Sequence, residues 1–347
     1  MRDILNKLYE TNDLEMDELR YLIENADLET INDIKHHAKA LTLRIYGNKI
    51  YIRALLEFSN YCRQNCMYCG LRKDNSKVDR FRLSKDEIIN AVKKAYDFGY
   101  RSFVMQSGED EYYTREILSD IIKTLKENFK GIAITLSIGE RSFEEYEAFK
   151  KAGADRFLLR HETADKRQYE KLHPGMSFEE RKRCLCDLKD LNYQVGAGFL
   201  VGLPNSNSTT MAQNLIFLKK LQPHMVGIGP LIIHKDTPLK YYKNGSVEDT
   251  LFYLSLTRLL LPKAMLPVTT AVNTLDKNGL EKGIESGGNV LMLNLSPQEV
   301  KEKYELYKNR ETKSVYDLDK VAERLESIGY QAYINRGDHI DWSKEEE

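Results

Sequence analysis

The chain has 347 residues, of which 41% are hydrophobic and 30% are charged, and its formal net charge is −1. This near balance of charge excludes a strongly basic nucleic-acid-binding protein. No apolar run approaches the length that crosses a bilayer, and the N-terminus lacks the apolar region of a signal peptide. We therefore expect a cytoplasmic protein that binds neither nucleic acid nor membrane.

Short amphipathic helices are expected over residues 1–47, as a cap without chemistry of its own. From residue 48, strands alternate with amphipathic helices. The expected strands are 51–58, 101–106, 132–137, 155–160, 195–201, 225–229, 266–270 and 289–294, and the helices between them are 84–98, 113–128, 142–152, 177–191, 208–220, 246–260 and 277–286. Eight such units predict an α/β fold, a complete (β/α)8 barrel of the TIM type over residues 48–296. Residues 297–347 are expected to be a C-terminal extension packed on the barrel.

Three cysteines follow the first expected strand, with the spacing C-x3-C-x2-C: Cys62, Cys66 and Cys69. Three thiolates suit a 4Fe-4S cluster in which one iron is left open to another ligand. Structural zinc is almost always held by four ligands, so a zinc loop needs a distant fourth residue and remains the alternative. The other two cysteines, Cys184 and Cys186, lie in a helical pattern and are expected to have no role.

Polar residues gather where the expected strands end. Ser107, Gly108 and Glu109 follow the second strand, and Arg160 to Thr163 follow the fourth. In a parallel barrel, the carboxyl ends of the strands carry the active site. A capped turn explains any one of these groups, but their alignment with the cysteine loop favours a single catalytic site.

The cysteine spacing, with Tyr68 before the last cysteine, is the signature of radical S-adenosylmethionine (SAM) enzymes. Over residues 48 to about 309 the chain resembles the HydE family, the radical SAM maturases of FeFe-hydrogenase. The resemblance rests on several strings, namely Glu57 to Asn60, Cys66 to Arg72, Gln106 to Asp110, Leu159 to Ala164, Val201 to Pro204, Met225 to Pro230 and Pro267 to Ala271. It implies a complete barrel, one 4Fe-4S cluster on the three cysteines, and SAM as the second cofactor.

The resemblance also implies which residues bind SAM. These are Tyr68, Ser107, Gly108, Glu109, Ser137, Glu162, Arg181, Met225 and Ile228. A carboxylate with backbone carbonyls suits the SAM ammonium, Glu162 would accept from the ribose hydroxyls, and a guanidinium fork at Arg181 suits the SAM carboxylate. Met225 and Ile228 would pack on the adenosine. The alternative for Glu162 and Arg181 is an ordinary ion pair on the rim of the barrel.

By the same resemblance, a deeper group would bind the substrate, an iron–cysteine complex that carries carbon monoxide and cyanide. Its members would be Thr135, Arg160, Thr269, Thr270, Met292, Tyr304 and Tyr307. The family implies the partner maturases HydG and HydF and an external electron donor. Residues 297–347 contain no cysteine, so we expect no second cluster.

Two other functions remain open. A different radical SAM reaction on an organic amino acid, like that of the PylB mutase, would need only another pocket lining. A non-catalytic iron–sulfur or zinc protein would need no pocket, and failure of reconstituted protein to cleave SAM would favour it.

Overall fold

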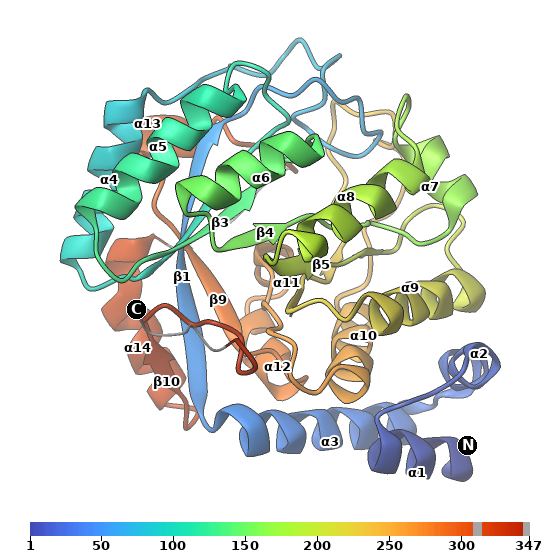
Figure 1. The fold of residues 1–347 in the computed structure, drawn as a ribbon. Helices are drawn as coiled ribbons and strands as arrows, with labels where there is room; N and C mark the ends of the chain where they lie inside the picture. Colours follow the sequence, from blue (N-terminus) through green and yellow to red (C-terminus); the bar gives the residue numbers. More distant parts are fainter. Residues whose placement is uncertain (308–313, 343–347) are drawn as a thin grey trace.

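A computed structural model describes residues 1–307 and 314–342 (Figure 1). Its strands are β1 (Lys49–Ser59), β2 (Ser102–Ser107), β3 (Ala133–Ser137), β4 (Arg156–Leu158), β5 (Gln194–Ala197), β6 (Leu200–Val201), β7 (Met225–Val226), β8 (Gly229–Pro230), β9 (Val290–Asn294) and β10 (Gln331–Tyr333). Every pair of neighbouring strands is parallel. The described chain is therefore an α/β protein built on a parallel sheet.

The helices alternate with these strands in chain order. They are α1 (Arg2–Thr11), α2 (Met16–Asn25), α3 (Leu28–Tyr46), α4 (Lys85–Asp97), α5 (Arg115–Asn128), α6 (Phe143–Ala152), α7 (Lys166–Leu172), α8 (Phe178–Asp190), α9 (Ser208–Leu221), α10 (Val247–Leu260), α11 (Thr270–Leu275), α12 (Gly279–Glu285), α13 (Gln298–Lys301) and α14 (Leu318–Glu326), with a 3-10 turn η1 (Val315–Asp317). The start of α4 shows why they begin where they do, because Ser84 and Glu87 form a reciprocal capping box there. Among these described helices, none combines the length and the apolar character needed to cross a membrane.

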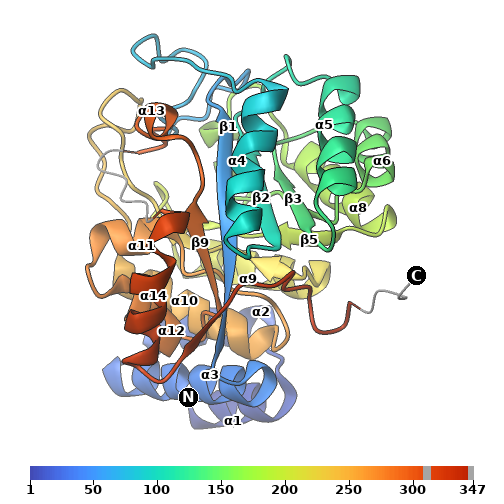
Figure 2. The same cartoon turned by 90° about the vertical axis from the view of Figure 1, so that its left-hand side faces the viewer.

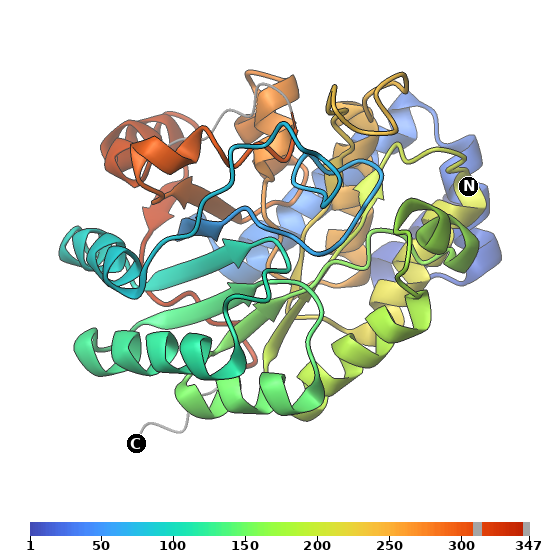
Figure 3. The same cartoon turned by 90° about the horizontal axis from the view of Figure 1, so that it is seen from above.

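The main sheet curves round in the order β9–β1–β2–β3–β4–β5–β7, and β10 pairs with the beginning of β1 (Figure 3). Within residues 1–307 and 314–342, its two ends are linked through single bridges only, one from Met225 to Met265 and one from Pro267 to Val290. The predicted seventh strand, 266–270, is thus a bridged stretch, and α11 already begins at Thr270. The parallel α/β fold is confirmed, but a complete eight-stranded barrel is not.

Side chains of β1 show how the sheet separates core from cavity. Ala54, Leu56 and Phe58 belong to the large apolar core between sheet and helices. Leu55, one position out of phase, lines a cavity on the other face. This follows from the alternation of side chains along a strand.

The two ends of β1 carry different structures. Figure 2 shows α3 at the start of β1 and the cysteine loop at its far end. The N-terminal helices pack on the outer layer, α3 against α10 and α2 against α9. At the same end as α3, the C-terminal segment contributes β10 and a buried ion pair between Arg156 and Asp338, 2.7 Å apart.

Candidate active site at the carboxyl ends of the strands

The cysteine loop lies directly beside the turn that follows β2. The backbone N–H of Glu109 points to Cys62 Sγ at 3.4 Å, and a Cβ on Gly108 would come within 2.2 Å of the Tyr61 carbonyl oxygen. Only glycine allows this approach. The expected juxtaposition of the cysteine loop with the Ser107–Glu109 turn is therefore present.

The three thiols of the loop are close enough to affect one another electrostatically. Burial raises the pKa of Cys69 to about 12, with Cys62 adding to the effect, and burial followed by the other two thiols raises the pKa of Cys66. Thiols of this kind become thiolates when a metal binds them. Among the described residues, no group of three or more His, Cys, Asp or Glu side chains is placed to hold a single metal ion. A cluster makes no such demand, because its cysteines bind different irons.

Tyr68, inside the same loop, is held by a buried histidine that sequence reasoning missed. Burial lowers the pKa of His173 to about 3, so the ring is neutral at physiological pH. Its Nδ1 lies 2.7 Å from the Tyr169 carbonyl, which can only accept, and therefore Nδ1 carries the proton. Nε2 then accepts a 2.8 Å hydrogen bond from the Tyr68 hydroxyl. The short helix α7 thus fixes the orientation of Tyr68.

Glu109 has a full set of donors in this structure. Its carboxylate accepts from Arg63 Nε at 3.1 Å, from Gln64 Nε2 at 2.6 Å and from the backbone N–H of Glu140 at 2.9 Å. A Cβ on Gly139 would lie 2.0 Å from the Glu109 side chain. The carboxylate is therefore rigidly placed between the cysteine loop and the end of β3.

Arg181 and Glu162 do not form the rim ion pair that was the alternative for them. Arg181 Nε donates to Glu140 at 2.7 Å, and a second nitrogen of Arg181 donates to the Arg160 carbonyl. Glu162 Oε1 lies 3.1 Å from Arg160 Nη2, whereas its buried Oε2 has no hydrogen-bond partner among the described residues. An unpartnered buried acceptor is costly unless a ligand supplies a donor.

The backbone explains how Glu162 reaches this position. Its φ is +61°, in the left-handed region that few side chains other than glycine adopt. Its N–H donates to the Gly198 carbonyl at 3.0 Å, and its carbonyl accepts from the Leu200 N–H at 3.0 Å. These bonds tie the residue to the turn after β5 and to the first residue of β6, and strained backbone held in this way is typical of functional sites.

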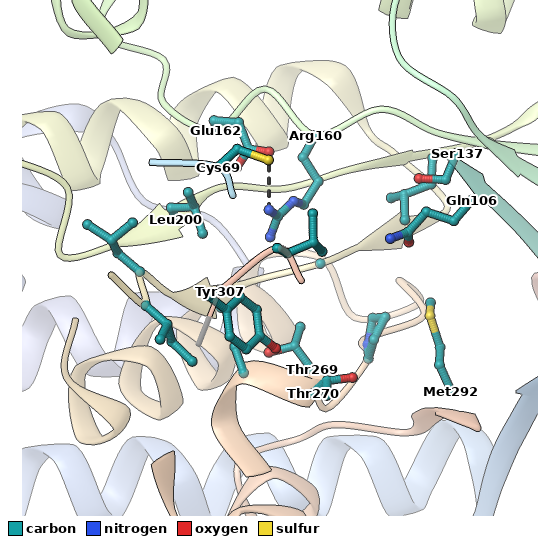
Figure 4. A pocket seen from close by; sticks show the side chains of 18 of the residues that line it. Cys69, Gln106, Ser137, Arg160, Glu162, Leu200, Thr269, Thr270, Met292 and Tyr307 are labelled. Atoms are coloured by element: carbon teal, nitrogen blue, oxygen red, sulfur yellow. Dashed lines mark ion pairs between the residues drawn. The ribbon is translucent and has the colours of Figure 1, made fainter. Parts of the chain in front are cut away.

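A cavity of about 340 Å³ opens beside these groups, on the face of the sheet that carries Leu55 (Figure 4). Of the residues expected to bind cofactor or substrate, those that line it are Tyr68, Cys69, Ser107, Ser137, Arg160, Glu162, Arg181, Thr269, Thr270, Met292, Tyr304 and Tyr307. Apolar residues such as Leu55, Leu158 and Val268 complete the wall. The cavity has the volume and the mixed lining typical of a small-molecule site.

The polar groups around Thr269 and Thr270 come from a helix start rather than a strand end. Thr269 is the N-cap residue of α11, and Thr270 is its first residue. The buried Thr269 hydroxyl has no hydrogen-bond partner among the described residues. Figure 4 shows both threonines and Tyr307 on the cavity wall opposite Arg160.

Several expected residues lie outside this cavity. Cys62, Cys66, Gly108 and Glu109 belong to the adjoining loop and turn. Thr135 is fully buried two residues before Ser137 on β3, and its hydroxyl has no hydrogen-bond partner among the described residues. Met225 packs in a separate cluster with Tyr46 and Met265, and Ile228 belongs to the outer core. Gly227 and Gly229 line the cavity where Met225 and Ile228 were expected.

Sequence reasoning assigned no role to two residues at this site, nor to Arg53, which reaches Gly337 of the C-terminal segment instead. Glu140 holds Arg181, Gln106 donates to the Tyr304 hydroxyl at 3.2 Å, and Arg53 is a fully buried cation whose Nε lacks a partner among the described residues. Burial and then the nearby Arg156 lower the pKa of Arg53. The sequence shows Arg53 as a single arginine within an apolar strand, but this pattern does not indicate which residues it contacts.

The residues present fit the two cofactors expected from the sequence. Three neighbouring thiols suit the cluster, and Cys69 reaches the cavity wall. Donors and acceptors suited to an amino acid and a ribose, among them Arg181 and the unpartnered Glu162 oxygen, lie on the same wall.

Comparison with known proteins identifies the family. Residues 56–218 match the Radical SAM superfamily. The chain is 44% identical to the [FeFe] hydrogenase maturase subunit HydE of Thermotoga maritima over 306 residues, which is 88% of this chain and 87% of that protein. It is 27% identical to the 3-methylornithine synthase of Methanosarcina acetivorans, over 94% of this chain and 92% of that one.

Two solved structures share the fold. The crystal structure of methylornithine synthase (PylB) has a TM-score of 0.83 at 24% identity, and the match covers 95% of this chain and 97% of that one. The maturase HydG of Carboxydothermus hydrogenoformans has a TM-score of 0.82 at 22% identity, over 96% of this chain and 79% of that one. On its identity to the Thermotoga maritima protein, and with a cysteine loop beside a cavity suited to SAM, the chain belongs to the HydE family of radical SAM enzymes.

Proposed function

We propose that this protein activates an iron–cysteine complex carrying carbon monoxide and cyanide, during assembly of the diiron subsite of FeFe-hydrogenase. The observation that carries the proposal is the single cavity that joins Cys69 and the unpartnered Glu162 oxygen to Arg160, Thr269 and Thr270. Arg160 pairs with Glu162 at 3.1 Å, so the attraction for a small anion rests on its remaining N–H donors together with the two hydroxyls in a largely apolar wall. When bound, the cluster and SAM would supply a 5′-deoxyadenosyl radical.

In this proposal the chain's own residues hold, orient and shield the reactants. Cys62, Cys66 and Cys69 hold one 4Fe-4S cluster, and Arg181 and Glu162 bind the carboxylate and ribose of SAM. The turn from Ser107 to Glu109 and Ser137 receives the amino group. Arg181 stays aligned through Glu140, and Tyr68 stays aligned through His173.

The substrate would lie deeper, against Arg160, Thr269 and Thr270, with Met292, Tyr304 and Tyr307 around it. Thr135 stays a proposed substrate residue, although it is buried on β3 outside the cavity lining. Met225 and Ile228 do not line the cavity, so they would contact the adenosine only if SAM binding moved them. We infer that the bridges at Met265 and Pro267 complete a barrel round this site, with residues 1–47 as a helical cap and residues 297–347 as an extension packed on the barrel, from which Tyr304 and Tyr307 reach the cavity. The cytoplasmic location expected from the sequence stays a prediction.

The partners follow from the same proposal. The carbonyl–cyanide complex must come from another maturase, for which HydG is the candidate. The product of this protein must then pass to a further maturase, for which HydF is the candidate. An external electron donor must supply the electron.

A second function is favoured by one specific observation. The 3-methylornithine synthase of Methanosarcina acetivorans matches 94% of this chain, so a rearrangement of an organic amino acid is the competing reaction.

Turnover distinguishes the two functions. Reduced, reconstituted protein receives either the synthetic iron–cysteine complex or lysine, and 5′-deoxyadenosine and hydrogenase activation are measured. We expect both signals to rise with the iron–cysteine complex and neither to rise with lysine. Turnover driven by lysine, with the complex inert, would replace the maturase proposal by the mutase.

A further inference from the structure

An exposed basic face surrounds the outer side of the cysteine loop. We define it by six residues that are exposed and form no ion pair within the described part of the chain: Lys73, Arg167, Lys171, Lys235, Lys240 and Lys243. They come from three segments, namely the cysteine loop, α7 and the loop 231–245, which gather at one end of the molecule (Figures 1 and 3).

Acidic residues in these segments do not cancel this charge. Asp165 accepts from the Gln168 N–H at 2.7 Å and caps α7, and Asp236 pairs with Lys77 at 2.6 Å. Asp74 and Glu170 remain as exposed acids. The six unpaired cations therefore outnumber the two exposed acids that remain in these segments.

The basic face also has the shape of a protein-binding surface. A groove of about 300 Å³ runs through it, lined by Met67, Arg167, Lys171 and Tyr242 among others. Tyr242 in this lining is 53% exposed, and the preceding residue, Tyr241, is 86% exposed. Tyrosine and arginine are the residues that most often anchor protein–protein interfaces.

The groove is one residue away from a cluster cysteine. Met67, which follows Cys66, forms part of its wall, and the Met67 N–H donates to the Leu172 carbonyl at the end of α7 at 2.9 Å. The Lys77–Asp236 ion pair joins the cysteine loop to the loop 231–245. A redox centre docked on this face would approach the cysteines by a short route.

We propose that the basic face is the docking site for an acidic protein that donates one electron to the centre held by Cys62, Cys66 and Cys69. The proposal rests on the proposed function, which requires an external reductant. In the transfer the partner is oxidised by one electron and the centre is reduced by one, and no bond forms or breaks. The chain's other cysteines, Cys184 and Cys186, are too few for a second all-cysteine cluster that could relay the electron from elsewhere.

A charge-reversal variant tests the docking site. Arg167→Glu, Lys171→Glu and Lys240→Glu are combined, and Arg44→Glu, Lys94→Glu and Lys130→Glu serve as a control with the same total charge change at exposed sites on α3, on α4 and after α5. The probe is a reduced acidic ferredoxin, and stopped-flow absorbance follows reduction of the reconstituted protein. Titration of cluster-free protein with the ferredoxin gives the dissociation constant.

We expect the triple variant to be reduced by the ferredoxin at least about tenfold more slowly at low salt, with the difference fading as salt screens the charges. The ferredoxin should also bind the cluster-free variant more weakly, while the control behaves like the parent. Equal rates in the triple variant and the parent would overturn the proposal. So would an equal loss in the control, or unchanged reduction together with lost binding of a partner maturase, which would assign the face to that protein.

A dithionite arm separates this proposal from the function on which it rests. Dithionite is small and needs no docking surface, so it should reduce the triple variant and drive SAM cleavage as in the parent. If dithionite drives no SAM cleavage even in the parent, the proposed function fails, and the binding measurement still judges the docking site.

Discussion

Two networks of charge lie at opposite ends of the sheet, and they differ in whether an unpartnered polar atom belongs to a cavity-lining residue: the Arg53 Nε near the first network does not, whereas two oxygens of the second do. At the end of the C-terminal segment, Arg156 donates to Asp338, to Ser102 and to the Arg336 carbonyl, and Arg336 pairs with Asp338 as well. At the cavity end, Arg181, Glu140 and Glu109 are equally well paired, but the Glu162 Oε2 and the Thr269 hydroxyl are not.

The difference separates a structural lock from a binding site. A network that satisfies itself gains nothing from a ligand, whereas an unpartnered buried oxygen gains a hydrogen bond when a donor arrives. Breaking the Arg156–Asp338 network should therefore cost stability without changing SAM affinity. Substitutions at the cavity end should instead lower SAM affinity without changing the free energy of unfolding.

The largest expected effect is at the cysteine loop. Cys66→Ala should abolish SAM cleavage and leave far less than the about four irons per chain of one cluster. The matched control is Cys186→Ala, because that cysteine is exposed on α8 and far from the loop in sequence. Iron and sulfide analysis after anaerobic reconstitution decides the result, and about eight irons per parent chain would refute the single cluster.

The next effect concerns the structural lock. Asp338→Asn leaves the buried Arg156 without its main counter-charge, which should lower the free energy of unfolding by about 3–5 kcal/mol. Calorimetry or denaturant unfolding measures the loss, with Asp319→Asn on the exposed face of α14 as control. SAM affinity should stay at the parent value, and a parallel loss of SAM binding would contradict the division between the two ends.

The same lock predicts a pH dependence. The paired arginines outweigh burial and hold the pKa of Asp338 well below its usual 3.8. Its contribution is therefore fully present above about pH 4 and is lost as the pH falls through the lower folded-state pKa. The acid-unfolding curve of Asp338→Asn should lack this component, and curves of identical shape would show that the ion pair contributes nothing.

At the cavity end, Glu162→Gln should weaken SAM binding by about 2–5 kcal/mol, because it removes a charged acceptor at a buried site. The free energy of unfolding should change little, since the amide keeps the shape of the carboxylate. Isothermal titration measures the affinity, and Glu170→Gln on the exposed side of α7 is the control. SAM binding at the parent level would remove Glu162 from the site.

The smallest expected effect is on Tyr68. Tyr68→Phe loses one neutral hydrogen bond to His173, worth about 0.5–1.5 kcal/mol, and SAM affinity should fall only a few-fold. His173→Phe should give a similar fall, and the double variant should be no worse than either single one. Additive losses would mean that the two residues act independently.

Much of this architecture could be predicted from the sequence, because the local periodicity of hydrophobic residues indicates strands and helices. The strands from β1 to β5 and β9 begin within two residues of their predicted starts. The prediction of a seventh strand was wrong because Pro267 and the early start of α11 leave room for single bridges only. The helix α7 was missed because seven residues are too few for a clear periodicity.

Site residues were easier to predict than their partners. Polar groups at strand ends indicated the cavity, and most of the expected residues line it. The pairing of Arg181 with Glu140, 41 residues apart, and of Tyr68 with His173 depends on how helices pack, which no local pattern records. Met225 and Ile228 show the converse, because a shift of one position along a segment turns a side chain from the cavity to the core.

The most direct test of the account is the ratio of 5′-deoxyadenosine formed to hydrogenase activated in Thr270→Val. This nearly isosteric change removes one cavity hydroxyl while leaving the cysteines, Glu162 and Arg181 in place. Radical transfer needs close and oriented contact, so we predict a clearly raised ratio at unchanged SAM affinity. A ratio equal to that of the parent, at full activity, would contradict the claim that cofactor and iron complex share this cavity.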